Sequence, residues 1–308
     1  MKNIYEVQAA NKRKSYLVMA LFVAFITLAT YFIVQGFSLY FGYDAGGLGV
    51  SGVALIISGL MSLGSYYYSD KIVLSISGAR PADKKRDFEF YTVVENLSIA
   101  AGIPIPKLYV IDDTAMNAFA TGRNPDHAVV VATSGLLAYL NRTELEGVIA
   151  HELTHIKNYD TLLMSLVSVL VGTVALLADF FLRASFWGGG RRGRDKEGAG
   201  VILLIGMLFA ILSPFIGQLI KLAISRRREF TADAGSVAIT RQPSGLISAL
   251  KKISLDHEPL EAANKATAHL YIENPFKNKI GDARSTFAGL FNTHPPVSER
   301  IQSLEEMA

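Results

Sequence analysis

The sequence contains no cysteine among its 308 residues. This absence excludes disulfide bonds, thiolate zinc sites and cysteine nucleophiles, and it is compatible with a reducing compartment. A large excess of one charge is also lacking, because the formal net charge is only +3. Bulk charge therefore does not indicate a polyanion-binding protein, and we expect no nucleic-acid partner.

Charged residues are missing from two long segments near the N-terminus. Residues 15–43 and 45–69 carry no Asp, Glu, Lys or Arg. Each segment is long enough to cross the hydrocarbon core of a bilayer, which takes about 20 helical residues. The sequence therefore predicts an N-terminal transmembrane hairpin over residues 1–69.

Two further apolar runs, 161–182 and 200–220, predict a second membrane hairpin over residues 161–225. The loop between these runs is basic, which conflicts with the positive-inside rule if both runs cross the bilayer. The pair therefore either crosses completely or enters the membrane without crossing it. The length of the two runs favours crossing, which gives about four transmembrane helices.

The distribution of basic residues predicts the orientation of the chain. Lys12, Arg13 and Lys14 precede the first span, several basic residues between 71 and 86 follow the second, and the turn between the spans has none. The positive-inside rule then places the N-terminus and the segment after residue 70 in the cytoplasm. We expect a multi-pass protein of the cell (inner) membrane.

The remaining segments, 70–160 and 226–308, have the pattern of a soluble domain divided into two halves. Residues 107–112 and 128–133 are short β-branched runs bounded by turn formers, which predicts strands. Residues 142–158 predict a helix, with Thr143 as a candidate N-cap and Glu146 as its partner in a capping box. The fold class is therefore an α-helical integral membrane protein with an α+β cytoplasmic domain.

The most specific motif is His151-Glu152-Leu153-Thr154-His155. On a helix this spacing places two imidazoles on one face, one turn apart, where both can bind a single Zn²⁺. The glutamate between them can accept a proton from the water that a zinc site activates. The motif therefore predicts a hydrolase with one zinc ion per chain, in which Glu152 is catalytic.

A catalytic zinc needs a third protein ligand. A third histidine six residues after the motif is excluded, because Thr161 occupies that position. Asp160 is possible but geometrically poor, since it lies close to the end of the helix. Glu229 is favoured, because Asp233 follows it by one helical turn and could accept the other N–H of a ligand imidazole.

At these residues the chain resembles the HtpX family of membrane-bound zinc proteases, which are related to the CAAX prenyl endopeptidases. The resemblance covers nearly the whole sequence and includes the N-terminal hairpin, HELTHIKNYD at 151–160, EFTAD at 229–233 and THPPVSERI at 293–301. It implies a gluzincin-like metalloprotease domain with His151, His155 and Glu229 as zinc ligands. It also implies membrane-protein quality control under stress, with cleavage of misfolded membrane proteins at the cytoplasmic face.

Two other segments gain a role from this resemblance. Asn117 and Ala118 resemble the segment through which gluzincins bind the main chain of a substrate, and a nearby strand edge could pair with an extended peptide. His294 could donate a hydrogen bond to the oxyanion of the scissile carbonyl, or it could be a packing histidine. Arg300 is expected to form a structural ion pair.

Other functions remain as alternatives. A CAAX-type processing protease would need a large enclosed membrane chamber, for which four spans are few. An intramembrane site-2-type protease would place the motif inside a span, whereas Arg142, Glu144 and Lys157 flank it here. A non-catalytic zinc-binding scaffold or transporter would require ionisable residues in the spans, which carry almost none apart from Asp179.

Overall fold

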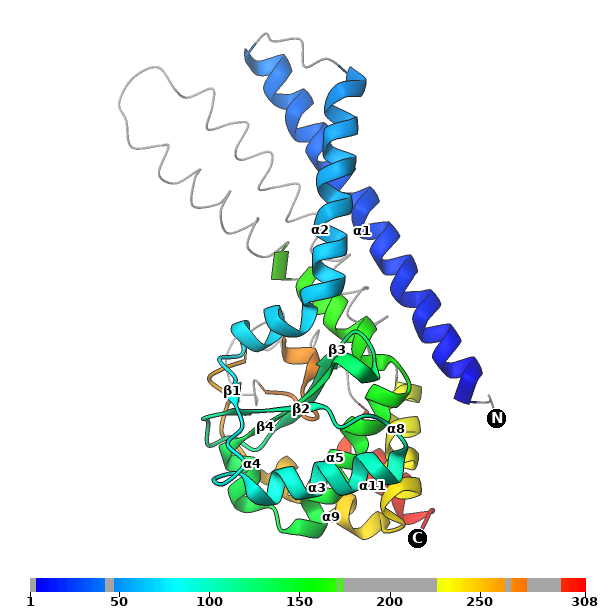
Figure 1. The fold of residues 1–308 in the computed structure, drawn as a ribbon, viewed down its shortest axis with the longest axis vertical. Helices are drawn as coiled ribbons and strands as arrows, with labels where there is room; N and C mark the ends of the chain where they lie inside the picture. Colours follow the sequence, from blue (N-terminus) through cyan, green and yellow to red (C-terminus); the bar gives the residue numbers. More distant parts are fainter. Residues whose placement is uncertain (1–3, 42–46, 171, 174–225, 264–266, 276–294) are drawn as a thin grey trace.

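The computed structural model describes residues 4–41, 47–170, 172–173, 226–263, 267–275 and 295–308 (Figure 1). Within these ranges a long helical hairpin projects from an α+β body, and the HExxH motif lies in the body. The predicted combination of a hairpin with an α+β domain is therefore present. The division of the chain into four domains stays a prediction.

The hairpin consists of α1 (Ile4–Phe41) and α2 (Gly47–Ile76), which pack against each other. A hydroxyl pair joins the two helices, with Thr27 Oγ1 2.9 Å from Ser58 Oγ. Large apolar side chains are exposed along both helices, namely Leu17, Leu21, Leu28, Val53, Leu55, Ile56, Ile57 and Leu60. Over the ranges given above, no helix combines the length and the hydropathy required of a candidate membrane span.

The body contains a four-stranded sheet in the order β1-β2-β4-β3. Its strands are β1 (Arg80–Pro81), β2 (Lys107–Ile111), β3 (Ala118–Gly122) and β4 (Ala128–Thr133). β2 and β4 are parallel, whereas β1 pairs with β2, and β3 with β4, in antiparallel fashion. The two predicted strands are confirmed. β3 was not predicted, because its sequence AFATG has little of the composition that is typical of strands.

Side chains on the two faces of the sheet belong to two different cores, as the alternation of a pleated strand requires. Val130 and Ala132 of β4 face the cluster built with α3 (Phe88–Ala101) and α5 (Arg142–Lys157). Val129 and Val131 face the other cluster, which includes Tyr271. α5 is therefore buried between the sheet and the helices that follow it.

The other helices of the body are η1 (Pro125–His127), α4 (Ser134–Tyr139), α8 (Arg226–Thr240), α9 (Pro243–Leu255), η2 (Ala268–Leu270) and α11 (Val297–Glu305). Of these, α8 and α9 pack directly against α5, and α11 packs against α8 and α9 (Figure 1). α8, α9 and α11 come from the second half of the sequence, so helices distant in the chain from the HExxH helix pack in the same body.

The N-terminus of α5 differs from the prediction. Asn141, not Thr143, is the N-cap, and its side-chain oxygen accepts a hydrogen bond from the N–H of Glu144 at 3.0 Å. The carboxylate of Glu144 accepts from the N–H of Asn141 at 2.9 Å in return, so the capping box begins two residues earlier. Lys252 of α9 also forms an ion pair with Glu144, so a contact with another helix stabilises this capping box.

Only the start of the predicted second hairpin lies within the described residues. Residues 160–170 are helical and buried, Met164 belongs to the cluster that includes Val129 and Val131 of β4, and Ser165 Oγ lies 2.7 Å from Thr121 Oγ1 of β3. The rest of that hairpin, from 174 to 225, lies outside the described residues, so its mode of entering the membrane stays a prediction.

Candidate metal centre

Three side chains that could hold a metal ion meet beside α5. His151 and His155 project from this helix, and Glu229 comes from the first turn of α8. The potential ligand atoms of the three residues all lie within 4.8 Å of one another. All three side chains are buried, with at most 3% of any residue exposed. The structure thus brings together the three residues that the sequence predicted as ligands.

The distances between these atoms fit a tetrahedral ion. The Nε2 atoms of His151 and His155 are 3.1 Å apart. The Glu229 carboxylate lies 3.8 Å from Nε2 of His151 and 3.6 Å from Nε2 of His155. Two ligands about 2.0–2.1 Å from one zinc at tetrahedral angles would be about 3.3 Å apart. The donor set of two imidazoles and one carboxylate therefore suits a zinc site with a position left for water.

Close packing of α8 on α5 makes this meeting possible. A Cβ added to Gly235 of α8 would lie 2.3 Å from Cγ2 of Thr154, so only glycine permits this approach. One residue later, Ser236 Oγ donates a hydrogen bond to the carbonyl of Gly147 at 2.8 Å. The small residues of α8 hold it at the distance from which Glu229 reaches the histidines.

His151 is supported by the Asp233–Arg300 ion pair. Asp233 Oδ1 lies 2.9 Å from Nδ1 of His151, and Arg300 donates to both oxygens of the same carboxylate at 2.9 and 2.6 Å. Asp233 and Arg300 are both fully buried. Since the carboxylate takes Nδ1–H, Nε2 of His151 is free to bind metal. The predicted ion pair of Arg300 is confirmed, and its partner is Asp233.

His155 is supported by Asp160. Asp160 Oδ2 lies 3.1 Å from Nδ1 of His155, and its other oxygen accepts from the amide of Asn11 at 2.8 Å. Arg228 Nε lies 3.4 Å from the same oxygen. Asp160 therefore orients the second histidine and does not belong to the group of three possible ligands. The sequence suggested Asp160 only as a ligand, and no local signal pointed to Asn11.

The two imidazoles have pKa values that are shifted in opposite directions. Burial lowers the pKa of His151 to about 4, helped by the charge of Arg300 and opposed by the hydrogen bond to Asp233. Burial also lowers the pKa of His155, but the hydrogen bond to Asp160 and the charges of Glu229 and Glu152 outweigh it and raise the value to about 9. At neutral pH, a chain without metal therefore carries its proton on His155.

Glu152 is buried next to the metal group, at 3% exposure, and its charge contributes to the raised pKa of His155. Its position follows from the helix, because it adjoins His151 on α5. This location is compatible with the predicted role of accepting a proton, and that role stays a prediction.

The predicted substrate segment lies at the edge of the sheet, on β3. Asn117 and Ala118 are each 1% exposed. The carbonyl of Ala118 accepts from the N–H of Ile272 at 3.0 Å, and the Asn117 amide donates to the carbonyl of Glu273 at 3.1 Å. The chain's own segment thus occupies this part of the edge, and substrate binding there stays a prediction. His294 lies outside the described residues.

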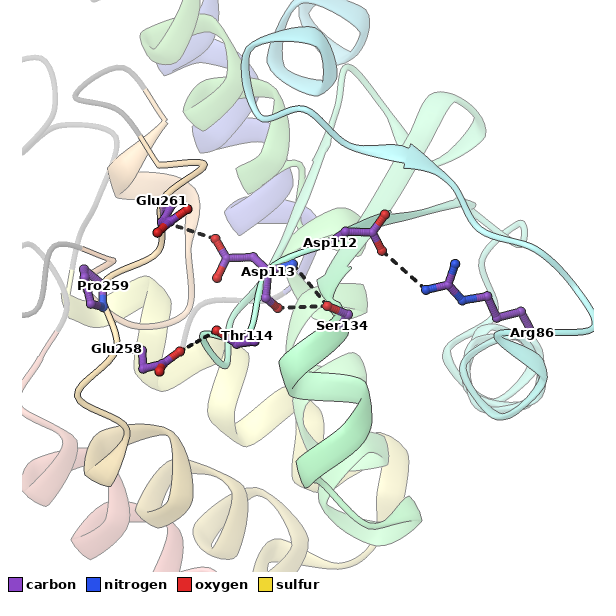
Figure 2. A pocket seen from close by; sticks show the side chains of 8 residues that line it. All are labelled: Arg86, Asp112, Asp113, Thr114, Ser134, Glu258, Pro259 and Glu261. Atoms are coloured by element: carbon purple, nitrogen blue, oxygen red, sulfur yellow. Dashed lines mark hydrogen bonds and ion pairs between the residues drawn. The ribbon is translucent and has the colours of Figure 1, made fainter.

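A separate pocket of about 640 Å³ lies beyond the end of β2 (Figure 2). None of the predicted site residues within the described ranges lines it. Three of its four acidic side chains are engaged within the protein. Asp113 accepts from the N–H of Glu261 at 3.0 Å, and Asp112 pairs with Arg80 at 2.8 Å. Figure 2 also shows Glu258 bonded to Thr114. These contacts tie the 258–261 segment to the loop before β3, so we assign the pocket a structural role.

Comparisons with known proteins show which proteins the chain is similar to. The model of peptidase family M48 matches residues 84–308. A "Protease HtpX homolog" of Caldanaerobacter subterraneus subsp. tengcongensis is 43% identical over 309 residues, covering 99% of this chain and 98% of that protein. Another, from Dictyoglomus thermophilum, is 44% identical over 303 residues and covers 98% and 94%. The crystal structure of S. mikatae Ste24p matches 97% of this chain and 66% of its own, with 18% identity and a TM-score of 0.46.

Proposed function

This chain belongs to peptidase family M48 and is a metallopeptidase, and we propose that it is a zinc-dependent endopeptidase acting on membrane proteins. The observation that carries the proposal is the meeting of His151, His155 and Glu229, with Glu152 buried beside them. Their separations suit one zinc ion, and a carboxylate and two imidazoles are the ligands of many catalytic zinc sites.

In the proposed mechanism His151, His155 and Glu229 hold the zinc. When bound, zinc lowers the pKa of a water molecule towards about 7 and polarises the carbonyl of the scissile peptide. Glu152 accepts a proton from the attacking water and delivers it to the leaving amine as the C–N bond breaks. Asp233 and Asp160 keep the two imidazoles in the tautomer that presents Nε2 to the ion.

We also propose that the protein works at the cytoplasmic face of the cell membrane and cleaves misfolded membrane proteins there. The apolar side chains exposed along α1 and α2 support insertion of the hairpin into lipid, since soluble surfaces rarely expose such a patch. The metal group lies near the base of this hairpin, because Asn11 of α1 contacts Asp160. A substrate that emerges from the bilayer would therefore reach the site directly.

Catalysis is tested with the full-length protein in proteoliposomes and with Glu152→Gln. We expect this variant to keep one zinc per chain and to cleave casein or an unfolded membrane protein at least about 10²-fold more slowly, because it lacks the general base. The measurements are gel-based cleavage rates and zinc content by mass spectrometry. Glu146→Gln is the matched control, since Glu146 lies on the same helix and pairs with Arg142 at the surface.

Normal cleavage by Glu152→Gln would remove the proposed mechanism. A wild-type protein that binds zinc but cleaves nothing, with or without chelator, would favour the scaffold alternative. Cleavage restricted to a prenylated CAAX peptide would favour the processing protease instead.

The orientation is tested by labelling, which the lack of cysteine in the chain makes simple. Ile99 is 73% exposed on α3, so Ile99→Cys places a single thiol on the protease body. We expect a membrane-impermeant maleimide to label it in inverted inner-membrane vesicles and not in intact spheroplasts. Labelling in intact spheroplasts would place the site on the opposite face.

A further inference from the structure

The N-terminal part of α1 lies against the turn that follows the HExxH motif. Gln8 Nε2 donates to the carbonyl of Lys157 at 2.8 Å, and Asn11 Nδ2 donates to the carbonyl of Asn158 at 2.9 Å. Lys12 Nζ lies 4.0 Å above the ring of Tyr159. A helix that starts the chain is thus bound to a segment almost 150 residues away, immediately after the second histidine.

The turn itself has an unusual backbone. Tyr159 has a φ of 59°, in the left-handed region that residues other than glycine seldom adopt. Such a conformation persists only where the surrounding structure holds it. Asn11 bonds to the residue on either side, through the carbonyl of Asn158 and the carboxylate of Asp160. α1 therefore stabilises the turn that places Asp160.

Asp160 links Asn11 to the metal group. One of its oxygens faces Nδ1 of His155 at 3.1 Å, and the other accepts from Asn11 at 2.8 Å. Because Asn11 donates to the second oxygen, and Nε of Arg228 lies 3.4 Å from the same oxygen, the carboxylate cannot rotate freely away from the imidazole. Asn11 is 3% exposed and Asp160 1%, so water does not readily replace this hydrogen bond.

We propose that Asn11 is a positioning residue of the metal site, which acts through Asp160 to hold His155 in its ligand orientation. On this view α1 is part of the catalytic unit as well as a candidate anchor, and a shift of α1 changes the affinity for metal. The inference rests on the proposed function in one respect only, namely that His155 is a metal ligand.

The test compares zinc affinity in full-length Asn11→Leu and in Gln8→Met. Both variants remove an amide donor that α1 supplies to the 157–160 segment. Of the two residues, Asn11 contacts Asp160, whereas Gln8 contacts the carbonyl of Lys157. We expect Asn11→Leu to weaken zinc binding roughly tenfold, as loss of a partner outside the ligands commonly does, and Gln8→Met to stay within about twofold of the wild type. Competition with a fluorescent chelator measures the affinity. The absorption spectrum of the Co²⁺-loaded protein reports ligand geometry at saturation.

A double-mutant cycle shows whether Asn11 acts through Asp160. If it does, Asn11→Leu added to Asp160→Asn should weaken zinc binding by no more than about twofold beyond Asp160→Asn alone. Asn11→Ala serves as a second variant if leucine is not accommodated. Multiplicative losses in the cycle, or wild-type affinity and an unchanged cobalt spectrum in both Asn11 variants, would overturn the proposal. A wild-type chain that binds neither ion would instead overturn the proposed function, and this inference with it.

Discussion

The two histidines of the HExxH motif lie one turn apart on α5, yet they are supported by different parts of the chain. His151 is held by Asp233 and Arg300, which come from α8 and α11. His155 is held by Asp160 just after α5 and, through it, by Asn11 of α1. One support is a fully buried ion pair, and the other is a carboxylate that accepts from the Asn11 amide at 2.8 Å and lies 3.4 Å from Nε of Arg228.

This difference separates two roles. The Asp233–Arg300 pair joins α8 to α11, so it supports the fold of the body as well as His151. The Asp160–Asn11 contact joins the body to the hairpin, so it relates His155 to the position of α1. The pKa values of the histidines follow the same division, since that of His151 is lowered and that of His155 is raised.

The largest difference is expected in stability. Arg300→Met removes the cation and leaves the buried carboxylate of Asp233 without its strongest partner. We expect the free energy of unfolding to fall by about 3–5 kcal/mol. Asn11→Leu removes hydrogen bonds from a neutral amide and should cost about 1–3 kcal/mol. The free energies are compared by urea unfolding of the metal-free variants in detergent, monitored by far-UV circular dichroism.

Two further variants test whether the unpaired buried charge of Asp233 causes the loss of stability in Arg300→Met. Arg300→Met combined with Asp233→Leu should recover most of the lost stability, because an apolar pair no longer leaves a charge buried. Arg142→Met, which breaks an exposed pair with Glu146, should cost no more than about 0.5 kcal/mol. Equal losses in Arg300→Met and Arg142→Met would contradict the distinction between the two supports.

A smaller effect is expected in the pH dependence of zinc binding. Zinc binds neutral imidazole, and between pH 4 and 9 only His155 carries a proton in the metal-free chain. Zinc must displace this proton, so the apparent affinity should rise about tenfold per pH unit from roughly pH 6.5 to 8.5 and level off near 9. Chelator competition across this range measures the slope.

The pH at which the zinc affinity levels off shows whether the pKa of His155 is raised. Two imidazoles with ordinary pKa values would show affinity levelling off above about pH 6.5. Asp160→Asn removes the carboxylate that raises the pKa of His155, so its plateau should begin at a lower pH than in the wild type. For the metal-free fold, the His155 contribution to stability is present below about pH 6.5 and lost as the pH rises through about 9. The His151 contribution is instead lost as the pH falls from about 6.5 through 4.

Local sequence patterns were sufficient to predict those parts of the site that lie on a single helix. The spacing of His151, Glu152 and His155 was enough to place them together, because residues four apart on a helix share a face. The β-branched runs at 107–112 and 128–133 predicted two strands, which the structure has at Lys107–Ile111 and Ala128–Thr133. The sequence did not predict β3, because a strand of small residues gives a weak local signal. The predicted cap of α5 was two residues too late, because Asn141 and Thr143 are both residue types that cap helices.

By itself, then, the sequence determined the reacting motif, since helix geometry fixes it within five residues. Glu229 was favoured over Asp160 from the sequence, but only the tertiary structure places it beside the histidines and turns Asp160 towards His155. The pairing of Arg300 with Asp233 and the contact of Asn11 with Asp160 were likewise decided by packing. These contacts join residues that are 67 and 149 positions apart in the sequence. The local periodicity of a helix does not predict which distant helix supplies a hydrogen bond to it.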